Sequence, residues 1–528
     1  MAKGFKVVDR GQQFLLPPSL LDWLPADHQV WFVIDAVASM DTTVFTSRAR
    51  LGGAGQAPYD PRMLLALLIW AYAGGVTSSR QVERRCREDI AFMVISGLAR
   101  PDHATIARFR KDHEAAFETL FTQVLMLCGR AGMGGLAHIA IDGTKLVANA
   151  SRNATCDGEA LRSMVRRLLA QAEADDTVED EHQGPDNGND LPPDLRDPQQ
   201  RAATINRLLA DAAVDPDPDR AKARTSAARR LNRTVALCDD LARRQHSASQ
   251  PVLDKARARL AKAQDRLART TAQITATNQA RQARDKELAA NGRALPGTRP
   301  VPVDQHAHVR AAVASVQRAT ARLNEKTAAI TDNTMKVNRT DPDCRLMPRH
   351  DGGFIPAYNA QLAVTADHLI LAVHLTQDTN DVAQATTMIT KTETAVNLLR
   401  DETNQPTLTI GTLLFDAGYN SDANLTTPGP DRLIAQSTRR RPAGTAPPEQ
   451  PPPHAPARDH MAWRHTTTEG RNLYRKRGST VEPVNAHLKD RRGLRRLARR
   501  GLTAATAELH LAAAVTNLLR LHSRTATT

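Results

Sequence analysis

Three acidic residues that lie far apart in the sequence have the residue type and setting to hold a divalent cation. Asp142 follows the apolar stretch 138–141 and Asp416 follows the apolar stretch 407–415, with a glycine close behind each aspartate. Short apolar runs of this kind predict buried strands. If the two strands are adjacent and parallel, their carboxyl ends open at the same edge of a sheet. Two carboxylates at one edge repel each other, and a divalent cation with oxygen ligands relieves that repulsion.

Glu482 is the third candidate, and it lies in the most basic part of the chain. Residues 471–500 contain eleven Lys or Arg and two acids, Glu482 and Asp490. A third carboxylate would complete a site for two ions about 4 Å apart, suited to in-line attack on a phosphodiester. Each acid also has an ordinary interpretation. Asp-Gly is a common turn, and Ser479 and Glu482 have the spacing of a helix capping box.

The chain ahead of Asp142 has the pattern of a helical domain. Asp60 and Pro61 precede the apolar run 63–73 as the cap and first residue of a helix. Apolar residues on helical spacing predict one long amphipathic helix over 106–124. Short helices with outward arginines could form a helix-turn-helix-like DNA reader or a plain bundle with a solvated basic face, and no spacing here is diagnostic.

A long insertion separates the first aspartate from the second. Residues 173–197 hold ten acids and one arginine among Pro, Gly and Asn, which predicts a disordered linker. We interpret the whole of 156–340 as a helical insert without a catalytic role. A seven-residue apolar repeat within it predicts a helical hairpin inside the chain: Leu253, Leu260, Leu267 and Ile274.

The β-rich pattern returns at residue 345. Three runs over 345–377, separated by Asp-Gly-Gly and Ala-Asp-His, predict an antiparallel meander. Asn380 is placed to cap the helix that follows. Residues 432–437 predict one more strand, and a linker with seven prolines occupies 441–458. The pattern beyond it is helical.

The composition fits a protein of several domains with a polyanionic partner. A length of 528 residues suggests two to four domains, and the net charge of +14 is concentrated in the basic stretch 471–500. Five cysteines without a CxxC pair indicate a reducing compartment. The N-terminus has no signal-peptide pattern, and the run 63–73 is too short to cross a bilayer. We therefore expect a cytosolic protein.

Several motifs, taken in chain order, resemble one known family. They are PYDPRMLLALLIWAY, RPDHATIARFRKDH, IDGTKLVANAS, GFIPAYNAQLAV, FDAGYNS and EGRNLYRKRGSTVEPVNAHLKDRRGLRRLARRGL. Together they are similar to the DDE transposases of bacterial insertion sequences that have a helical N-terminal domain and a helical insert after the first catalytic aspartate. Asn485 follows Glu-Pro-Val where that family usually carries phenylalanine.

The resemblance implies an α/β fold, in which an RNase H-like mixed sheet carries an all-α N-terminal domain and an α-helical insertion. It implies that Asp142, Asp416 and Glu482 are the catalytic and metal-binding triad for two Mg²⁺ ions, with Mn²⁺ as a substitute. The implied partner is double-stranded DNA, at the terminal inverted repeats and the target, bound by a homodimer in the synaptic complex. Tyr474, Arg477 and Lys489 match the family's Tyr–Arg–Glu–Lys signature, and we expect phosphate contacts from Arg491, Arg492, Arg495 and Arg496.

The expected organisation has four segments. Residues 1–131 are the DNA-binding helical domain, 132–155 the first strand of the core, 156–340 the insertion, and 341–528 the rest of the core with C-terminal helices. Three functions remain open from the residues: a transposase that cuts and joins DNA, an RNase H-like nuclease without strand transfer, and a catalytically inactive DNA-binding protein.

Overall fold

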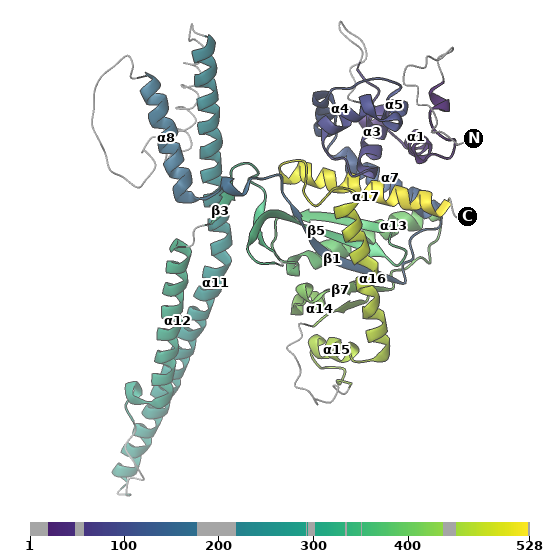
Figure 1. Cartoon of the computed structure of the whole chain (residues 1–528). Coiled ribbons are helices and arrows are strands. Elements are labelled where there is room, and N and C mark those ends of the chain that lie inside the picture. The colour runs from purple at the N-terminus through teal and green to yellow at the C-terminus, as the bar shows by residue number, and fades with distance from the viewer. Residues whose placement is uncertain are drawn as a thin grey trace, which may run out of the picture. The chain divides into compact units, whose positions relative to one another are not determined.

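The structure is a computed structural model that describes residues 19–47, 58–176, 218–291, 293, 301–332, 335–349, 351–436 and 450–525. It divides into two compact units (Figure 1). Met1–Ala154 and Thr340–Thr528 form the first, here called the core unit, and Thr155–Arg339 form the second, the helical unit. Beyond Asp176, the acidic stretch expected to be a disordered linker lies outside the described residues, as does the proline-rich stretch up to residue 449.

The N-terminal part of the core unit is helical, as its pattern predicts. The cap at α3 is confirmed, because the Asp60 side chain accepts a hydrogen bond from the backbone N–H of Arg62 and Pro61 is the first helical residue. The long helix expected over 106–124 is wrong: two helices, α6 and α7, occupy that stretch. The elements are η1 Leu20–Asp22, α1 Gln29–Ser39, α2 Thr43–Thr46, α3 Pro61–Ala73, α4 Ser79–Glu88, α5 Ile90–Ser96, α6 His103–Asp112 and α7 Ala116–Arg130.

A six-stranded mixed sheet forms the centre of the core unit. Its order is β4-β5-β1-β7-β8, and β6 also pairs with β5. The pairs β1–β7 and β7–β8 are parallel, and the pairs of β5 with β1, β4 and β6 are antiparallel. The predicted meander over 345–377 is therefore confirmed. The strands are β1 His138–Val147, β4 Arg345–Pro348, β5 Phe354–Thr365, β6 Ile370–Thr376, β7 Thr412–Phe415 and β8 Arg432–Ile434.

The remaining helices of the core unit follow the strands in sequence. Asn380 does not cap a helix, because the helix after β6 begins at Ala385, behind a short 3-10 turn. The elements are η2 Arg152–Ala154, η4 Val382–Gln384, α13 Ala385–Thr403, η5 Ala417–Tyr419, α14 Asp422–Thr426, α15 Ala457–Arg464, α16 Thr468–Asp490 and α17 Leu502–Thr525.

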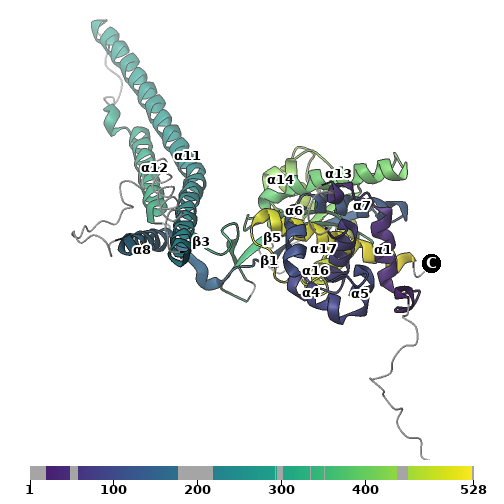
Figure 2. The ribbon, with the colours of Figure 1, turned by 90° about the horizontal axis from the view of Figure 1, so that it is seen from above.

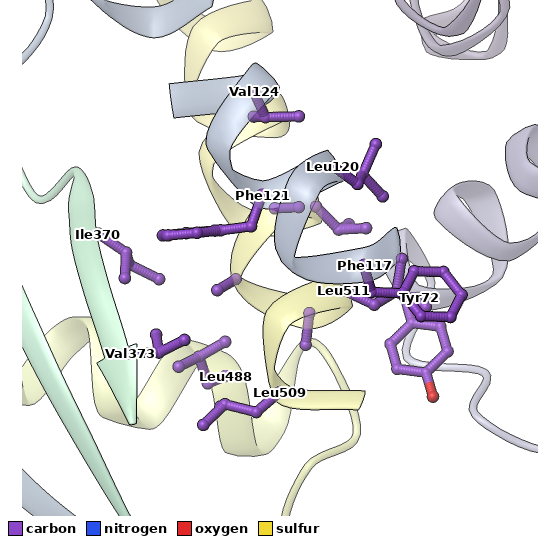
Figure 3. Packing of buried hydrophobic residues seen from close by; sticks show 14 of the residues in the cluster. Tyr72, Phe117, Leu120, Phe121, Val124, Ile370, Val373, Leu488, Leu509 and Leu511 are labelled. Carbon is purple, nitrogen blue, oxygen red and sulfur yellow. The ribbon is translucent and has the colours of Figure 1, made fainter. Parts of the chain in front are cut away.

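Helix α17 is the central helix of the hydrophobic core. It packs between α7 and strand β6 (Figure 3), and nearly all residues from Ala504 to Leu518 are buried. A helix that is apolar on all sides is stable only when protein surrounds it. Among the described helices, α17 is the one long and apolar enough to cross a membrane, but 83% of its apolar window is buried inside the core unit. We therefore assign it to the core.

The helical unit is built from long helices. Helix α11, Pro218–Ala290, and helix α12, Ala307–Asp332, run side by side (Figures 1 and 2), which confirms the predicted hairpin. The seven-residue repeat on α11 is only half-buried, as a narrow and weakly apolar seam requires. The other elements are β2 Thr155–Asp157, α8 Gly158–Asp176, η3 Val303–Gln305 and β3 Lys336–Asn338, and β2 pairs with β3.

Candidate active site

The parallel pair β1–β7 brings the two aspartates together. Ile141 is paired with Phe415 across the strands, so the next residues, Asp142 and Asp416, are neighbours. Adjacent strands lie about 4.8 Å apart. The predicted position of Asp142 at the end of a strand is wrong, because β1 continues to Val147 and Asp142 lies in mid-strand. The two carboxylates come together because the short strand β7 stops at Phe415, beside the middle of β1.

Helix α16 carries Glu482 against this part of the sheet. The capping-box interpretation is wrong, because α16 begins at Thr468, with Thr467 as its cap, and Ser479 lies inside the helix. Val481, Val484 and Leu488 form a buried stripe, and α16 contacts β1, β5 and β7. Glu482 lies beside that stripe with 67% of its side chain exposed. Its carboxylate is therefore accessible to solvent, ions or DNA.

Arg477 links the acids of the sheet to the acid of the helix. Its guanidinium lies 3.2 Å from Asp142 Oδ1 and 3.8 Å from Glu482 Oε1. Only 16% of the Arg477 side chain and 15% of the Asp142 side chain are exposed, so little water screens the first pair. Together these contacts place Asp142 and Glu482 around one cationic group.

Burial and mutual repulsion raise the pKa of both aspartates. Burial is the largest cause of the rise in the pKa of Asp142 to about 6, which Arg477 opposes and the carboxylate of Asp416 reinforces. Burial also raises the pKa of Asp416, which accepts a 2.8 Å hydrogen bond from the backbone N–H of Gly418. A raised pKa means that the surrounding positive charge does not fully stabilise the ionised carboxylates. A bound divalent cation would supply the additional positive charge.

Asn485 holds the other oxygen of Asp142. Its Nδ2 donates a 3.0 Å hydrogen bond to Asp142 Oδ2, and its side chain lies one turn beyond Glu482 on α16. The residue is only 8% exposed, and its Oδ1 has no hydrogen-bond partner. A buried amide oxygen without a partner is costly unless a donor or a cation satisfies it. The residue that departs from the family pattern thus contacts the first aspartate directly.

Asp381 is a further acid at this site that the sequence argument missed. It follows β6, and its Oδ1 would collide with a side chain at Gly143, the residue after Asp142. Its charge contributes to the raised pKa of Asp142 and of Asp416. The sequence pattern does not single out Asp381, because Asp378 lies nearer to the end of the same strand.

The predicted DNA-binding residues have different environments. Tyr474 is half-buried against His465 and Arg477, and Lys489 Nζ donates a 2.5 Å hydrogen bond to Thr144 Oγ1 on β1. Arg491, Arg495 and Arg496 are exposed, although Arg495 pairs with Asp490 and Arg496 donates to backbone carbonyls of the segment after β1.

Arg492 differs from these neighbours because it is buried. It donates to the carbonyl oxygens of Tyr72 and Ala73 at the end of α3 and contacts His487. The guanidinium is thus occupied within the protein, and we leave Arg492 out of the DNA surface proposed below.

Within the described residues, no three His, Cys, Asp or Glu side chains are close enough together to hold a metal ion as they stand. The donor set nevertheless suits a hard divalent cation, since it consists of carboxylates and an unpartnered amide oxygen. Gly418 leaves a small space beside the oxygens of Asp416 and Asp381 that a Cβ atom would fill. The residues present therefore fit the cation that the fold implies.

The sheet order and the placement of the acids define a class of protein. A mixed sheet with one aspartate on its central strand, a second after the parallel neighbour, and a glutamate on a helix packed against it is an RNase H-like catalytic core. Two family models match the chain: Transposase domain (DUF772) over residues 18–112, and Transposase DDE domain over residues 450–522. Both matches are to transposase domains, and together they support an insertion-sequence DDE transposase. No curated protein and no solved structure is significantly similar to it.

Proposed function

We propose that this transposase cleaves and joins DNA at the terminal inverted repeats of its insertion sequence, using Asp142, Asp416 and Glu482 to hold two Mg²⁺ ions, for which Mn²⁺ can substitute. The observation that supports the proposal is the adjacency of Asp142 and Asp416 on parallel strands, together with Glu482 on α16, whose Oε1 lies 3.8 Å from the Arg477 guanidinium that also pairs with Asp142. Glu482 lies within the segment matched by the DDE domain, and the two aspartates lie outside both matched segments.

The chemistry requires charge stabilisation around a phosphodiester. When bound, the two ions would activate the attacking hydroxyl and stabilise the leaving 3′-oxygen in hydrolysis and in the later transesterification. The three carboxylates would orient the ions, and Asn485 would keep Asp142 in place. Arg477 and Lys489 would add positive charge beside the scissile phosphate.

The DNA surface that we propose extends from the active site to the N-terminal helices. A hollow in the core unit is lined by basic side chains from both ends of the chain: Arg80 and Lys111, with Arg496 and Arg500. Phosphate contacts by such residues release counterions and make binding steeply dependent on salt. This hollow connects the basic N-terminal face with the basic segment after α16.

The proposed partner is double-stranded DNA, both at the element ends and at the target. We propose a homodimer, because two element ends must be held together during transposition. The proposed location is the cytoplasm, in association with the nucleoid.

A cleavage assay tests the proposal. DNA from the two sides of the coding region, where inverted repeats should occur, is end-labelled and incubated with the full chain and Mg²⁺ or Mn²⁺. We expect nicked or cut ends and joined products. Asp142→Ala, Asp416→Ala and Glu482→Gln should each abolish cleavage and retain the DNA shift. Glu469→Gln, an exposed acid of the same helix, is the control and should cleave normally.

The products separate the three functions. Cleavage without joined products would indicate a nuclease without strand transfer. A DNA shift without cleavage would indicate an inactive DNA-binding protein. Normal cleavage by any one of the three acid variants would remove that residue from the proposed triad.

A further inference from the structure

We infer that Asp381 is a fourth carboxylate of the active site, and that it contributes its Oδ2 directly to the divalent cation held by Asp416. The inference rests on the proposed function and adds a ligand to the same site. The carboxylate lies between β1, β5 and the turn after β7, although it belongs to none of them.

One oxygen of Asp381 is fixed by the sheet. Oδ1 accepts hydrogen bonds from Asn359 Nδ2 at 2.7 Å and from Gln361 Nε2 at 2.6 Å. Both donors are buried on β5, and Gln361 is tied in turn to Asn359 and to the hydroxyl of Tyr419. A buried network in which every member has a partner holds its groups rigidly. Asp381 is therefore oriented before any ion arrives.

The ordinary role for an acid at this position would be to cap the turn that follows. Asp381 precedes η4, but its side chain makes no capping hydrogen bond to that turn. The side-chain amides of Asn359 and Gln361 on β5 donate hydrogen bonds to the Asp381 carboxylate instead, so this side chain is directed toward the sheet. A capping role does not explain its orientation.

The second oxygen faces Asp416. A Cβ atom built on Gly418 would lie 3.2 Å from Asp381 Oδ2 and 3.0 Å from Asp416 Oδ1, so both oxygens border the same small space. A Cβ atom on Gly143 would lie only 2.3 Å from Asp381 Oδ1, so only glycine permits this carboxylate beside Asp142. Two carboxylate oxygens around one space repel each other unless a cation lies between them.

An independent observation at Asn485, which contacts Asp142, also indicates a ligand. The Asn485 side chain reaches Asp142 from α16, and its Oδ1 is buried without a partner. Carboxylate oxygens and an amide oxygen from three different elements thus surround Asp142. This oxygen-only set is what Mg²⁺ and Mn²⁺ bind.

The test measures Mn²⁺ binding by titration calorimetry on the full chain without DNA. Asp381→Asn keeps an oxygen that can accept from Asn359 and Gln361 but loses the negative charge. We expect it to weaken Mn²⁺ affinity by at least about tenfold. Asp378→Asn is the matched control, since Asp378 is exposed in the same segment and only accepts from Gln384. We expect it to bind Mn²⁺ as the wild type does.

Thermal unfolding in EDTA shows whether the variants fold, and Asp381→Ser is a second neutral replacement. If Asp381 only supports β5, Asp381→Asn will bind Mn²⁺ with unchanged affinity, and the inference is wrong. Two further variants, Asp142→Asn and Asp416→Asn, show whether only the inference about Asp381 fails or the proposed function fails as well. If those two variants lose affinity and Asp381→Asn does not, only the fourth ligand is refuted. If the wild type binds no Mn²⁺, the proposed metal site fails as well.

Discussion

Replacing Asp142 with asparagine should stabilise the protein in the absence of divalent metal, and the gain should increase with pH. Burial raises the pKa of this carboxyl from its ordinary value of 3.8 to about 6, against the attraction of Arg477. The folded state therefore binds the proton more tightly than the unfolded state does. The contribution of Asp142 to stability is complete below pH 3.8 and is lost as the pH rises through 6.

The size of the effect follows from the same pKa difference. One pKa unit corresponds to about 1.36 kcal/mol, so the ionised Asp142 lowers the free energy of unfolding by about 3 kcal/mol. Asparagine resembles the protonated carboxyl and can still accept the hydrogen bond from Asn485. The difference in stability between Asp142→Asn and wild type should be about 0.5 kcal/mol at pH 4 and about 3 kcal/mol at pH 7.5.

The assay is thermal or urea unfolding of both proteins in EDTA at several pH values. Taking the difference between the two proteins removes the titration of groups that they share. Asp422→Asn is the control, because the Asp422 side chain is 83% exposed and lies on the surface helix α14. It should give the same difference from wild type at every pH. Two results would refute the burial of Asp142 among like charges. One is a stability difference between Asp142→Asn and wild type that does not change with pH, and the other is a loss of stability of Asp142→Asn at pH 7.5.

Three further predictions concern other parts of the core unit. Glu508→Ala should lower the free energy of unfolding by about 3–5 kcal/mol, because it leaves the buried charge of Arg110 without its ion-pair partner at 3.8 Å and leaves Tyr72 and two backbone N–H groups without their acceptor. Urea unfolding measures this change, and a loss below about 1 kcal/mol would contradict it. His510→Gln should reduce the loss of stability that occurs as the pH falls from 6.5 to 4. Burial lowers the pKa of His510 to about 4, so the unfolded chain takes up the proton at a higher pH than the folded protein does. A pH profile of Tm equal to that of the wild type would contradict this prediction. Arg491→Ala should reduce the slope of log affinity for DNA against log salt concentration by about one without changing Tm. Arg492→Ala should instead lower Tm, because Arg492 is buried within the protein. Equal salt slopes for the two variants would contradict these roles.

Individual strands and helices were predictable because the strands of the core are strongly apolar and the helices have clear spacing, whereas the fold class followed from the family resemblance. Two similar apolar stretches that each precede an aspartate made the parallel pairing of β1 and β7 a hypothesis, which the structure confirms. The break between α6 and α7 was not predictable in the same way. No glycine or proline marks it, and the chain turns where the His113 ring contacts the carbonyl oxygen of Phe109.

The site was predictable only in part. Asp142 and Asp416 could be proposed because each follows a short apolar stretch, and Glu482 because it lies in the most basic part of the chain. Asp381 could not, because it lies in the polar segment after β6, and only the amides of β5 bring its carboxylate to the site. The contact between Asn485 and Asp142 also depends on how α16 packs on the sheet, which no local pattern specifies. Contacts between distant elements are what the sequence left undetermined.

The central claim is that Asp142, Asp416 and Glu482 share divalent cations. Anomalous diffraction from crystals of the full chain grown with Mn²⁺ tests it most directly. We predict a manganese peak within coordination distance of Asp142 and Asp416, with Glu482 completing the site once DNA is bound. Ordered carboxylates with no manganese between them, or manganese bound only elsewhere on the chain, would contradict the claim.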